Sequence, residues 1–136
     1  MTTIDMRIQN AELFGDRLNK FLKDNNDKFS QILRKVVLTV LTGIVKYNPV
    51  DTGLSQNNWQ VDFGRVNDDI LDADTNENAP IKRAERVLER MPNGGIGQIV
   101  FIYNNVFYTV YLEFGTEKMP AFAMVRTALG EVAVQL

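Results

Sequence analysis

A run of apolar residues at helical spacing, in the first third of the chain, constrains the fold more than any other feature. From Phe14 to Val45 these residues recur every three or four positions, which places them on one face of an α-helix. They are Phe14, Leu18, Phe21, Leu22, Phe29, Ile32, Leu33, Val36, Val37, Val40, Leu41, Ile44 and Val45. A continuous helix of about 33 residues would be a rod about 50 Å long. Such a rod is longer than one compact domain needs, so it either extends onto another subunit or kinks and packs on its own sheet.

The sequence Asp24-Asn25-Asn26-Asp27 is the weak point of this predicted helix. All four residues are poor helix formers, and the polar Asn25 falls on the apolar stripe. One long helix is predicted, and a kink or a break at these four residues stays open. The helix ends at Tyr47-Asn48, because the residue before Pro49 is disfavoured in the helical conformation.

Two short segments have the composition of β-strands. Trp59–Phe63 alternates apolar and polar residues, and Ile99–Tyr103 is β-branched, aromatic and entered through glycines. The first is predicted to be half-buried and the second buried, and both are expected to share a core with the helix stripe from Ile32 to Ile44. The side chains predicted in this core are Trp59, Val61, Phe63, Phe101 and Leu112.

A short helix is predicted between these two strands. Residues 80–91 carry apolar side chains at helical spacing, opened by Pro80 and closed by a Pro-Asn-Gly-Gly turn. The preceding residues, 65–79, are polar, acidic and rich in Asn and Asp, which is typical of a surface loop.

The last third of the chain contains one ambiguous segment and one clear helix. Residues 106–113 have strand propensity but also place Phe107 and Tyr111 on one helical face, so both structures stay open. Residues 121–134 are predicted to form a C-terminal helix. Its apolar stripe consists of Phe122, Val125, Leu129 and Val132.

Together these elements predict an α+β fold in a single domain over residues 1–136. A long N-terminal helix packs on a small, mainly antiparallel sheet, with a short inserted helix and a C-terminal helix. At 136 residues the chain is long enough for one core and too short for two independent ones. Residues 1–10 are polar and are predicted to form a flexible N-terminal arm.

Composition narrows the function classes. The chain contains no Cys and no His, which removes disulfide frameworks, Cys-based metal sites and the usual general base, and no cofactor is expected. The net charge of −2 argues against a protein that grips nucleic acid by bulk charge. No stretch has the apolar length of a signal peptide or a membrane span, so we expect a soluble protein made in the cytoplasm, with no membrane partner.

Charge is distributed unevenly along the chain. Residues 1–50 hold eight Lys/Arg and five Asp/Glu, residues 51–80 hold one and seven, and residues 81–136 hold six and five. This division suits head-to-tail contact between identical copies, although a solvated acidic loop explains it as well.

Two motifs stand out against this background. The first is Asn48-Pro-Val-Asp-Thr-Gly-Leu54, and the second lies in the aromatic-rich stretch Val100–Pro120, where Asn104–Thr116 reads Asn-x-x-x-Tyr-x-x-x-x-Glu-Phe-Gly-Thr. Together they resemble the tail-component family of long-tailed bacteriophages, the neck or tail-completion proteins. The resemblance runs in order from Leu33 to Leu129. The chain departs from the family at Thr109, where Ala is usual, and at Gln56-Asn57-Asn58, where a basic residue and a Ser are common.

The resemblance implies a structural virion protein and not an enzyme. Such a protein is synthesised in the host bacterial cytoplasm and forms a ring in the virion neck. The resemblance implies a hexamer, with a dodecamer as the alternative. The ring joins head-closure proteins to the tail, and DNA passes through its lumen. The alternative function is that of a tail-terminator or head-closure ring protein. The motif residues carried over are Pro49, Asp51, Thr52, Gly53, Leu54, Asn104, Tyr108, Glu113, Phe114, Gly115 and Thr116.

Aromatic side chains within and beside the second motif are the interface candidates. Aromatic residues are favoured at the centres of protein interfaces, where they bury a large area with few rotatable bonds. The candidates are Phe107, Tyr111 and Phe122.

Three carboxylates support an alternative of a different class. Asp51, Asp62 and Glu113 would hold a metal in a small hydrolase or nuclease, although they lack any motif spacing. A local role is simpler for the first of them, with Asp51 or Thr52 capping a short turn through Gly53–Asn57. Glu113 lies in an apolar run and must either reach solvent or find hydrogen-bond donors.

A basic helix face is the remaining candidate site. Its bases, interleaved with Glu85 and Glu89, are Lys82, Arg83, Arg86 and Arg90. They would face DNA in a protein that lines a DNA channel, but mixed signs at helical spacing usually mark a solvated face.

Overall fold

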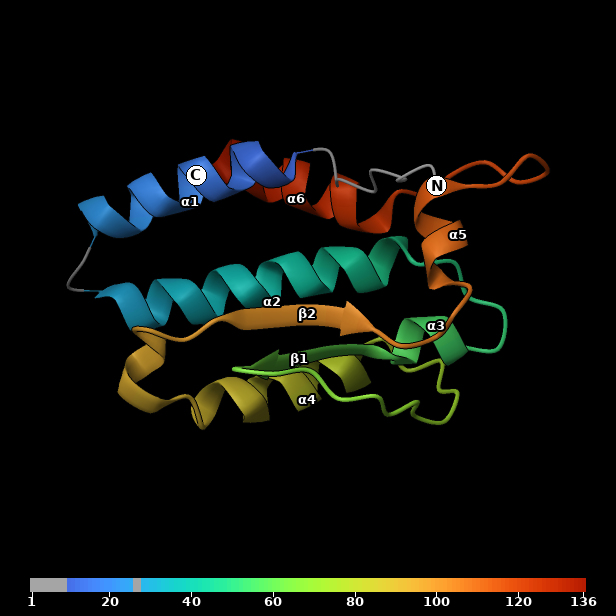
Figure 1. The fold of residues 1–136 in the computed structure, drawn as a ribbon, viewed down its shortest axis with the longest axis horizontal. Helices are drawn as coiled ribbons and strands as arrows, with labels where there is room; N and C mark the ends of the chain where they lie inside the picture. The colour runs from blue at the N-terminus through green and yellow to red at the C-terminus, as the bar shows by residue number, and fades with distance from the viewer. Residues whose placement is uncertain (1–9, 26–27) are drawn as a thin grey trace, which may run out of the picture.

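The computed structural model describes residues 10–25 and 28–136, and over these residues the fold is α+β, as predicted (Figure 1). The helices are α1 (Ala11–Asp24), α2 (Phe29–Tyr47), α3 (Leu54–Asn57), α4 (Asn78–Glu89), α5 (Thr109–Phe114) and α6 (Met124–Gln135), with a 3-10 turn, η2 (Pro92–Gly95). Two strands, β1 (Trp59–Phe63) and β2 (Val100–Asn104), form an antiparallel sheet. Residues 1–9 of the predicted arm lie outside the described residues, as do Asn26 and Asp27.

The apolar run forms two helices, so the prediction of one long N-terminal helix is wrong. α1 ends at Asp24, because Asn25 leaves the helical conformation with φ −125° and ψ 40°. Both the backbone N–H (3.1 Å) and the side-chain amide (2.9 Å) of Asn25 donate to the Phe21 carbonyl oxygen. The chain then reverses, and α1 lies alongside α6 on one side of α2 (Figure 1). α2 has 19 residues and is about 28 Å long. A rod reaching onto another subunit is therefore no longer required.

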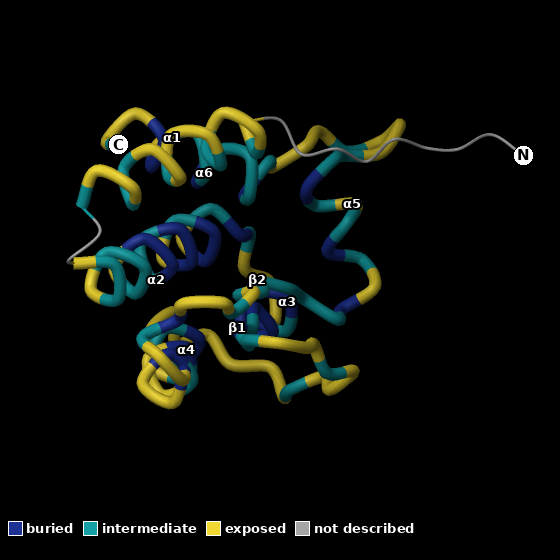
Figure 2. Tube along the Cα trace, turned by 60° about the vertical axis from the view of Figure 1, so that its left-hand side comes forward, coloured by how far each residue is buried: buried dark blue, intermediate teal, exposed yellow. Residues whose placement is uncertain are grey.

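α2 forms the centre of the core. Its buried residues are Val36, Val37, Val40, Leu41, Ile44 and Val45. α6 covers one side of α2 with Met124, Ala128 and Val132, while the sheet and α4 cover the other side (Figures 1 and 2). A Cβ atom at Gly43 would lie 3.0 Å from the Ala128 Cβ, so α2 and α6 are in close contact there.

The register of the two strands decides which side chains enter the core. Val61 pairs with Ile102, and these two residues face the core together with Trp59. Phe101 pairs with Asp62, and because side chains alternate along a strand, both lie on the opposite face of the sheet. The prediction of Phe101 in the shared core is therefore wrong. β2 is half-buried along its whole length, whereas the sequence predicted a buried strand.

The predicted helix 80–91 is confirmed as α4, with Ala84, Leu88 and the following Met91 buried against β1 and α2. Most of the acidic segment before it is exposed. Asn58, which is fully buried, holds this segment against α3. Its amide nitrogen donates to the Leu71 carbonyl (2.9 Å), and its oxygen accepts from the Leu71 N–H (2.6 Å).

The C-terminal part differs from the prediction in where its helices begin. The ambiguous segment contains a helix, α5. The last helix starts at Met124, because Ala123 has a left-handed backbone (φ 50°) that interrupts a helix beginning at residue 121. Its buried positions are Met124, Ala128, Val132 and Ala133, whereas Phe122 precedes the helix and is exposed. None of the helices in the described part of the chain is long and apolar enough to cross a membrane.

Candidate functional site

The two sequence motifs meet at one end of the molecule. The first motif follows the end of α2 and leads into α3, and the second runs from the end of β2 through α5. Figure 1 shows β2 pointing toward α3 and α5, so segments about 50 residues apart in the sequence lie side by side. A direct bond joins them, because the side-chain amide of Asn104 donates to the Ser55 carbonyl oxygen (2.8 Å).

A buried polar network strengthens this junction. The side-chain oxygen of Asn48 accepts from the Trp59 indole N–H (2.8 Å) and from the Ser55 hydroxyl (3.2 Å). The Ser55 hydroxyl also lies 3.0 Å from the Thr109 hydroxyl, which donates to the Asn104 side-chain oxygen (3.2 Å). The Ser55 and Thr109 hydroxyl groups each have one proton to donate, so at any moment two of the contacts Ser55–Asn48, Ser55–Thr109 and Thr109–Asn104 are hydrogen bonds. Since buried polar groups are costly to leave unpaired, the network holds the two motifs in one arrangement.

Thr109 links the two motifs through its hydroxyl group. Its side chain is buried and lies between Ser55 and Asn104, where an alanine would make no hydrogen bond. The sequence analysis did not identify Ser55 or Trp59 as members of a polar network, because neither belongs to the quoted motifs.

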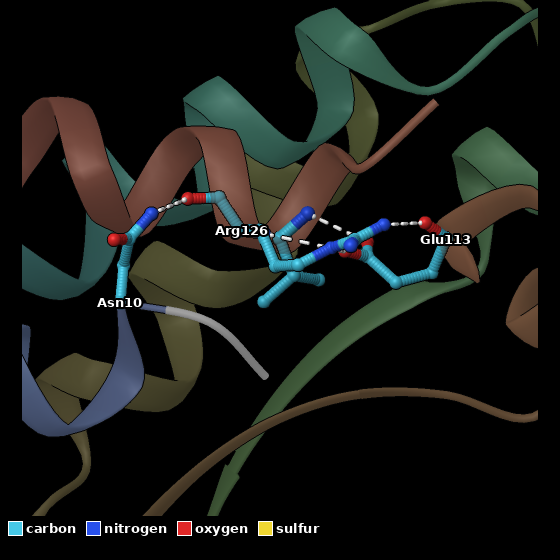
Figure 3. A network of polar contacts seen from close by, with 4 residues as sticks. Asn10, Glu113 and Arg126 are labelled. Atoms are coloured by element: carbon cyan, nitrogen blue, oxygen red, sulfur yellow. Dashed lines mark hydrogen bonds and ion pairs between the residues drawn. The ribbon is translucent and has the colours of Figure 1, made fainter. Parts of the chain in front are cut away.

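Glu113 finds donors on another helix. Its carboxylate accepts from the backbone N–H groups of Val125 (2.8 Å) and Arg126 (3.3 Å), in the first turn of α6. It also pairs with the Arg126 Nε at 3.0 Å (Figure 3). Ala123 offers α6 no side-chain cap, so Glu113 supplies the cap from α5. Arg126 was missed by the sequence analysis, although it and Lys118 are the only bases that follow Arg90.

Arg126 joins three parts of the chain. Its guanidinium donates to the Glu113 carbonyl oxygen and lies 5.1 Å from the centre of the Phe114 ring, a cation–π distance. Its own carbonyl accepts from the Asn10 side-chain amide (3.1 Å), so the start of α1 is tied to α6 (Figure 3).

Gly115 and Thr116 complete the second motif by turning the chain. Gly115 has φ 78°, and a Cβ there would lie only 2.8 Å from the Ala121 nitrogen, so a side chain would be both strained and crowded. The Thr116 hydroxyl oxygen accepts from the N–H groups of Lys118 (3.2 Å) and Met119 (3.1 Å). These contacts form a compact loop between α5 and α6.

The first motif contains a similar turn. The Thr52 hydroxyl oxygen accepts from the Leu54 N–H (3.2 Å), so Thr52 and not Asp51 makes the predicted local bond. Gly53 precedes α3 with φ 82° and lies directly against the Asp74 backbone. Asp51 is exposed, and no hydrogen bond to its carboxylate is found within residues 10–25 and 28–136.

Around this scaffold, the three interface candidates are all exposed. The exposed fraction is 81% for Phe107, 51% for Tyr111 and 43% for Phe122. An apolar groove of about 550 Å³ lies between the first motif and α5, and of the three candidates only Phe122 lines it. It is lined mainly by Val50, Leu54, Tyr108, Leu112, Met119 and Phe122. Exposed aromatic side chains on and next to α5, together with this apolar groove, mark a candidate surface for binding another macromolecule.

The basic face of α4 is only partly available to a ligand. Arg83 donates to the side-chain oxygen of Asn57 (3.0 Å) and to the Asn57 backbone carbonyl, and burial lowers the pKa of its guanidinium. Lys82, Arg86 and Arg90 are exposed, but so are Glu85 and Glu89 between them. The exposed face of α4 therefore carries both positive and negative charges, and Arg83 is not available to a ligand because it is bonded to Asn57.

The three carboxylates of the metal hypothesis have separate surroundings. Glu113 is engaged by Arg126, Asp62 accepts from the Tyr103 hydroxyl on the outer face of the sheet, and Asp51 points to solvent. Among the described residues, no three acidic side chains lie close enough together to hold a metal ion. The structure thus gives the metal-dependent hydrolase hypothesis no site.

The chain matches no protein-family model, and neither a curated protein nor a solved structure is similar to it. The two motifs and the surface that they form are the features of this chain that bear on its function.

Proposed function

We propose that this chain is a structural protein of the bacteriophage neck, which assembles into a ring that joins head-closure proteins to the tail. The observation that carries the proposal is the convergence of the two motifs. Both of the sequence segments that resemble the tail-component family lie in one surface, joined by the network of Asn48, Ser55 and Thr109. The aromatic side chains Phe107, Tyr111 and Phe122, within and just after the second motif, are exposed.

The division of roles within the motifs supports an assembly function. The buried motif residues satisfy backbone and side-chain polar groups, as Glu113 does for the first turn of α6. Three exposed side chains within and beside the second motif, Phe107, Tyr111 and Phe122, are aromatic, and none of them belongs to the core. A rigid scaffold that presents aromatic side chains is suited to binding another protein, because little conformational entropy is lost when the contact forms.

A ring requires contacts between two different surfaces of identical copies, and the uneven charge of the chain is compatible with such contacts. By resemblance we propose a hexamer, with a dodecamer as the alternative. Its neighbours are the head-closure, tail-terminator and tube proteins, and DNA is present only in the lumen. A tail-terminator role and a head-closure role are the alternatives, and the particle composition described next distinguishes them.

The composition of purified particles tests the proposal. Intact virions, tail-less heads and free tails are separated by density, and the copies of this protein per particle are counted by quantitative mass spectrometry. We expect one ring per virion, located at the head–tail junction by antibody labelling. Retention on tail-less heads would indicate head closure, and retention at the end of free tails would indicate a terminator. Absence from virions, or many copies along the tail tube, would contradict the neck assignment.

A further inference from the structure

We infer that residues 4–8 of one copy of this chain pair, as a third strand, with the free edge of β2 in the next copy. The inference rests on the proposed ring and names a backbone contact between its neighbouring copies. It is drawn from the hydrogen bonds of β2, the sequence of residues 4–8 and the position of Asn10.

β2 has one edge without a hydrogen-bonding partner. The Gly64 N–H donates to the Ile99 carbonyl (2.9 Å), so these residues form a hydrogen-bonded pair in the register of the sheet. Such pairs alternate with non-bonded pairs in an antiparallel sheet, so Phe101 and Tyr103 bond to β1. Within residues 10–25 and 28–136, no hydrogen bond is found to the backbone groups that point away from β1. These outer-edge groups are the N–H and C=O of Val100, Ile102 and Asn104.

The two edges of the sheet differ in how they are protected. β1 lies between β2 and α4 (Figure 1), and Arg83 of α4 donates to the Trp59 carbonyl on the edge of β1 (3.5 Å). β2 reads Val-Phe-Ile-Tyr-Asn, without the charged residue or proline by which many edge strands avoid pairing. An unprotected edge of a two-stranded sheet is a template for a third strand.

The sequence of residues 4–8, Ile-Asp-Met-Arg-Ile, has the pattern of a half-buried strand. Apolar and polar residues alternate in it, as they do in β1, which reads Trp-Gln-Val-Asp-Phe. In a strand this alternation places three apolar side chains on one face and two charged side chains on the other. The apolar residues are Ile4, Met6 and Ile8, and the charged residues are Asp5 and Arg7. We call residues 4–8 the arm strand.

The arm strand matches both faces of the sheet beside β2. Val100 and Ile102 are half-buried against the core, so a strand next to them meets apolar surface on that face. Phe101 and Asp62 lie on the opposite face, which suits the two charged side chains. The five residues of the arm strand also equal the length of β2. Pairing therefore continues the backbone hydrogen bonds and the division between apolar and polar faces.

The position of Asn10 assigns the arm strand to a neighbouring copy. The Asn10 amide nitrogen donates to the Arg126 carbonyl (3.1 Å) and would lie 2.9 Å from a Cβ at Gly130. Both residues are two positions from Ala128, which packs on α2, so Asn10 lies on the face of α6 away from the core. Ile8 can be at most about 7 Å from Asn10, whereas α6 is about 10 Å across. The arm strand therefore cannot pair along β2 of its own copy.

Exchange of the arm strand between copies produces the kind of contact that a ring needs. The arm of one copy meets the sheet of the next, so two different surfaces are used and the contact can repeat until it closes. Pairing of two β2 strands with each other would instead be two-fold and would end at a dimer.

Cysteine cross-linking identifies the copy that receives the arm strand. The chain contains no cysteine, so each substitution gives a unique thiol. The variants Asp5→Cys and Phe101→Cys are mixed in equal amounts and, after subunit exchange, treated with a short bismaleimide. We expect covalent dimers in the mixture, none above background from either variant alone, and a ladder of covalent oligomers from the double variant. Thr42→Cys, at an exposed position in the middle of α2, replaces Phe101→Cys in the control.

Hydrogen exchange of single amides tests the pairing itself. In oligomers of the full chain, the three outer-edge amides should exchange slowly, because each of them then donates a hydrogen bond. The amides of Phe101 and Tyr103 are the internal reference, since they bond to β1 with or without the arm strand.

Substitutions in the arm strand separate its two faces. The triple variant Ile4→Asp, Met6→Asp and Ile8→Asp should lose the oligomer and the protection of the outer-edge amides, and keep the protection of the reference amides. The double variant Asp5→Ser and Arg7→Ser is the matched control and should keep both, because its side chains lie on the polar face.

Three outcomes would overturn the inference. Internal cross-links in monomers of the double cysteine variant, without a ladder, would assign the arm strand to its own copy. Dimers of Phe101→Cys alone, as abundant as those in the mixture, would indicate that two β2 strands pair with each other. Fast exchange of the outer-edge amides in the full chain, at every soluble protein concentration, would show that the edge is not paired.

Particle composition is independent of these results. The neck assignment can stand when the arm strand does not pair with β2. Equally, cross-links in a protein that is absent from virions would retain the contact and reject the neck.

Discussion

Single residues in the two motifs divide into buried ones that satisfy polar groups and exposed ones that are accessible to a partner. Asn48, Thr109 and Glu113 belong to the first group, and each forms more than one hydrogen bond. Asp51 and Phe107 belong to the second. Substitutions in the first group should therefore reduce the free energy of unfolding, and those in the second should leave it nearly unchanged.

The turn of the first motif allows a direct comparison between neighbouring residues. Thr52→Ala removes the acceptor for the Leu54 N–H and should lower the free energy of unfolding by about 0.5–1 kcal/mol. Asp51→Ala should change it by less than about 0.5 kcal/mol, because the carboxylate is exposed. Urea unfolding followed by circular dichroism measures both. An equal loss from the two substitutions would mean that Asp51 also caps α3.

Tyr103 should titrate unusually late. Burial, together with the hydrogen bond that its hydroxyl donates to Asp62, raises the pKa of Tyr103 to about 12. Because the folded pKa lies above the ordinary value of 10, this bond contributes its full stability below about pH 10 and loses it between about pH 10 and 12.

The measurement is the ultraviolet absorbance of tyrosinate against pH, taken as the difference between the unsubstituted protein and Tyr103→Phe. We expect the difference to appear near pH 12. Circular dichroism at each pH verifies that the protein is still folded. A difference that titrates near pH 10 would contradict the hydrogen bond to Asp62.

Helices and turns in this fold depend on residues from other elements. α1 packs against α6, and α6 begins where Glu113 of α5 reaches its first turn. The start of α6 has no side-chain cap in the local sequence, since Ala123 precedes it. The short α5 thereby controls the start of the longer α6.

The cap supplied by Glu113 predicts a graded mutational series. Glu113→Ala leaves the Arg126 Nε and two backbone N–H groups without their acceptor, and should cost about 3 kcal/mol, since the Glu113 and Arg126 side chains are only 6% and 19% exposed. Glu113→Gln keeps one acceptor oxygen and should cost less, about 1–2 kcal/mol. The exposed Glu117→Gln is the matched control and should have almost no effect.

Hydrogen exchange distinguishes a local from a global effect of these substitutions. In Glu113→Ala the amides of Val125 and Arg126 should exchange faster, more than those in the middle of α2. Unchanged exchange at both amides would show that α6 does not depend on the carboxylate.

The molecule as a whole presents its aromatic side chains at the end where the motifs meet. A triple variant, Phe107→Ser, Tyr111→Ser and Phe122→Ser, should lose less than about 1.5 kcal/mol of stability, because each side chain is largely exposed. If the proposed function is correct, the variant should fail to enter particles. Val134→Ser, which changes an exposed apolar residue on α6, is the control and should assemble normally. Normal incorporation of the triple variant would remove these aromatics from the proposed interface.

Local periodicity in the sequence was sufficient for much of this architecture. The stripe from Val36 to Val45, the alternation in Trp59–Phe63 and the spacing within residues 80–91 each identified the element that the structure contains. These features could be predicted because an apolar stripe with a regular period can be buried by only one kind of secondary structure. The α+β class followed from the same patterns.

Tertiary structure decided what depends on residues far apart in the chain. The break at Asn25 became a reversal because α1 packs against α6, and Phe101 left the core because of the register between β1 and β2. Glu113 found its partner in Arg126, and the two motifs met through Asn104 and Ser55. The periodicity of apolar residues does not predict such pairings, because many packings bury the same stripes. The choice among these packings depends on hydrogen bonds and contacts that exist only in the folded chain.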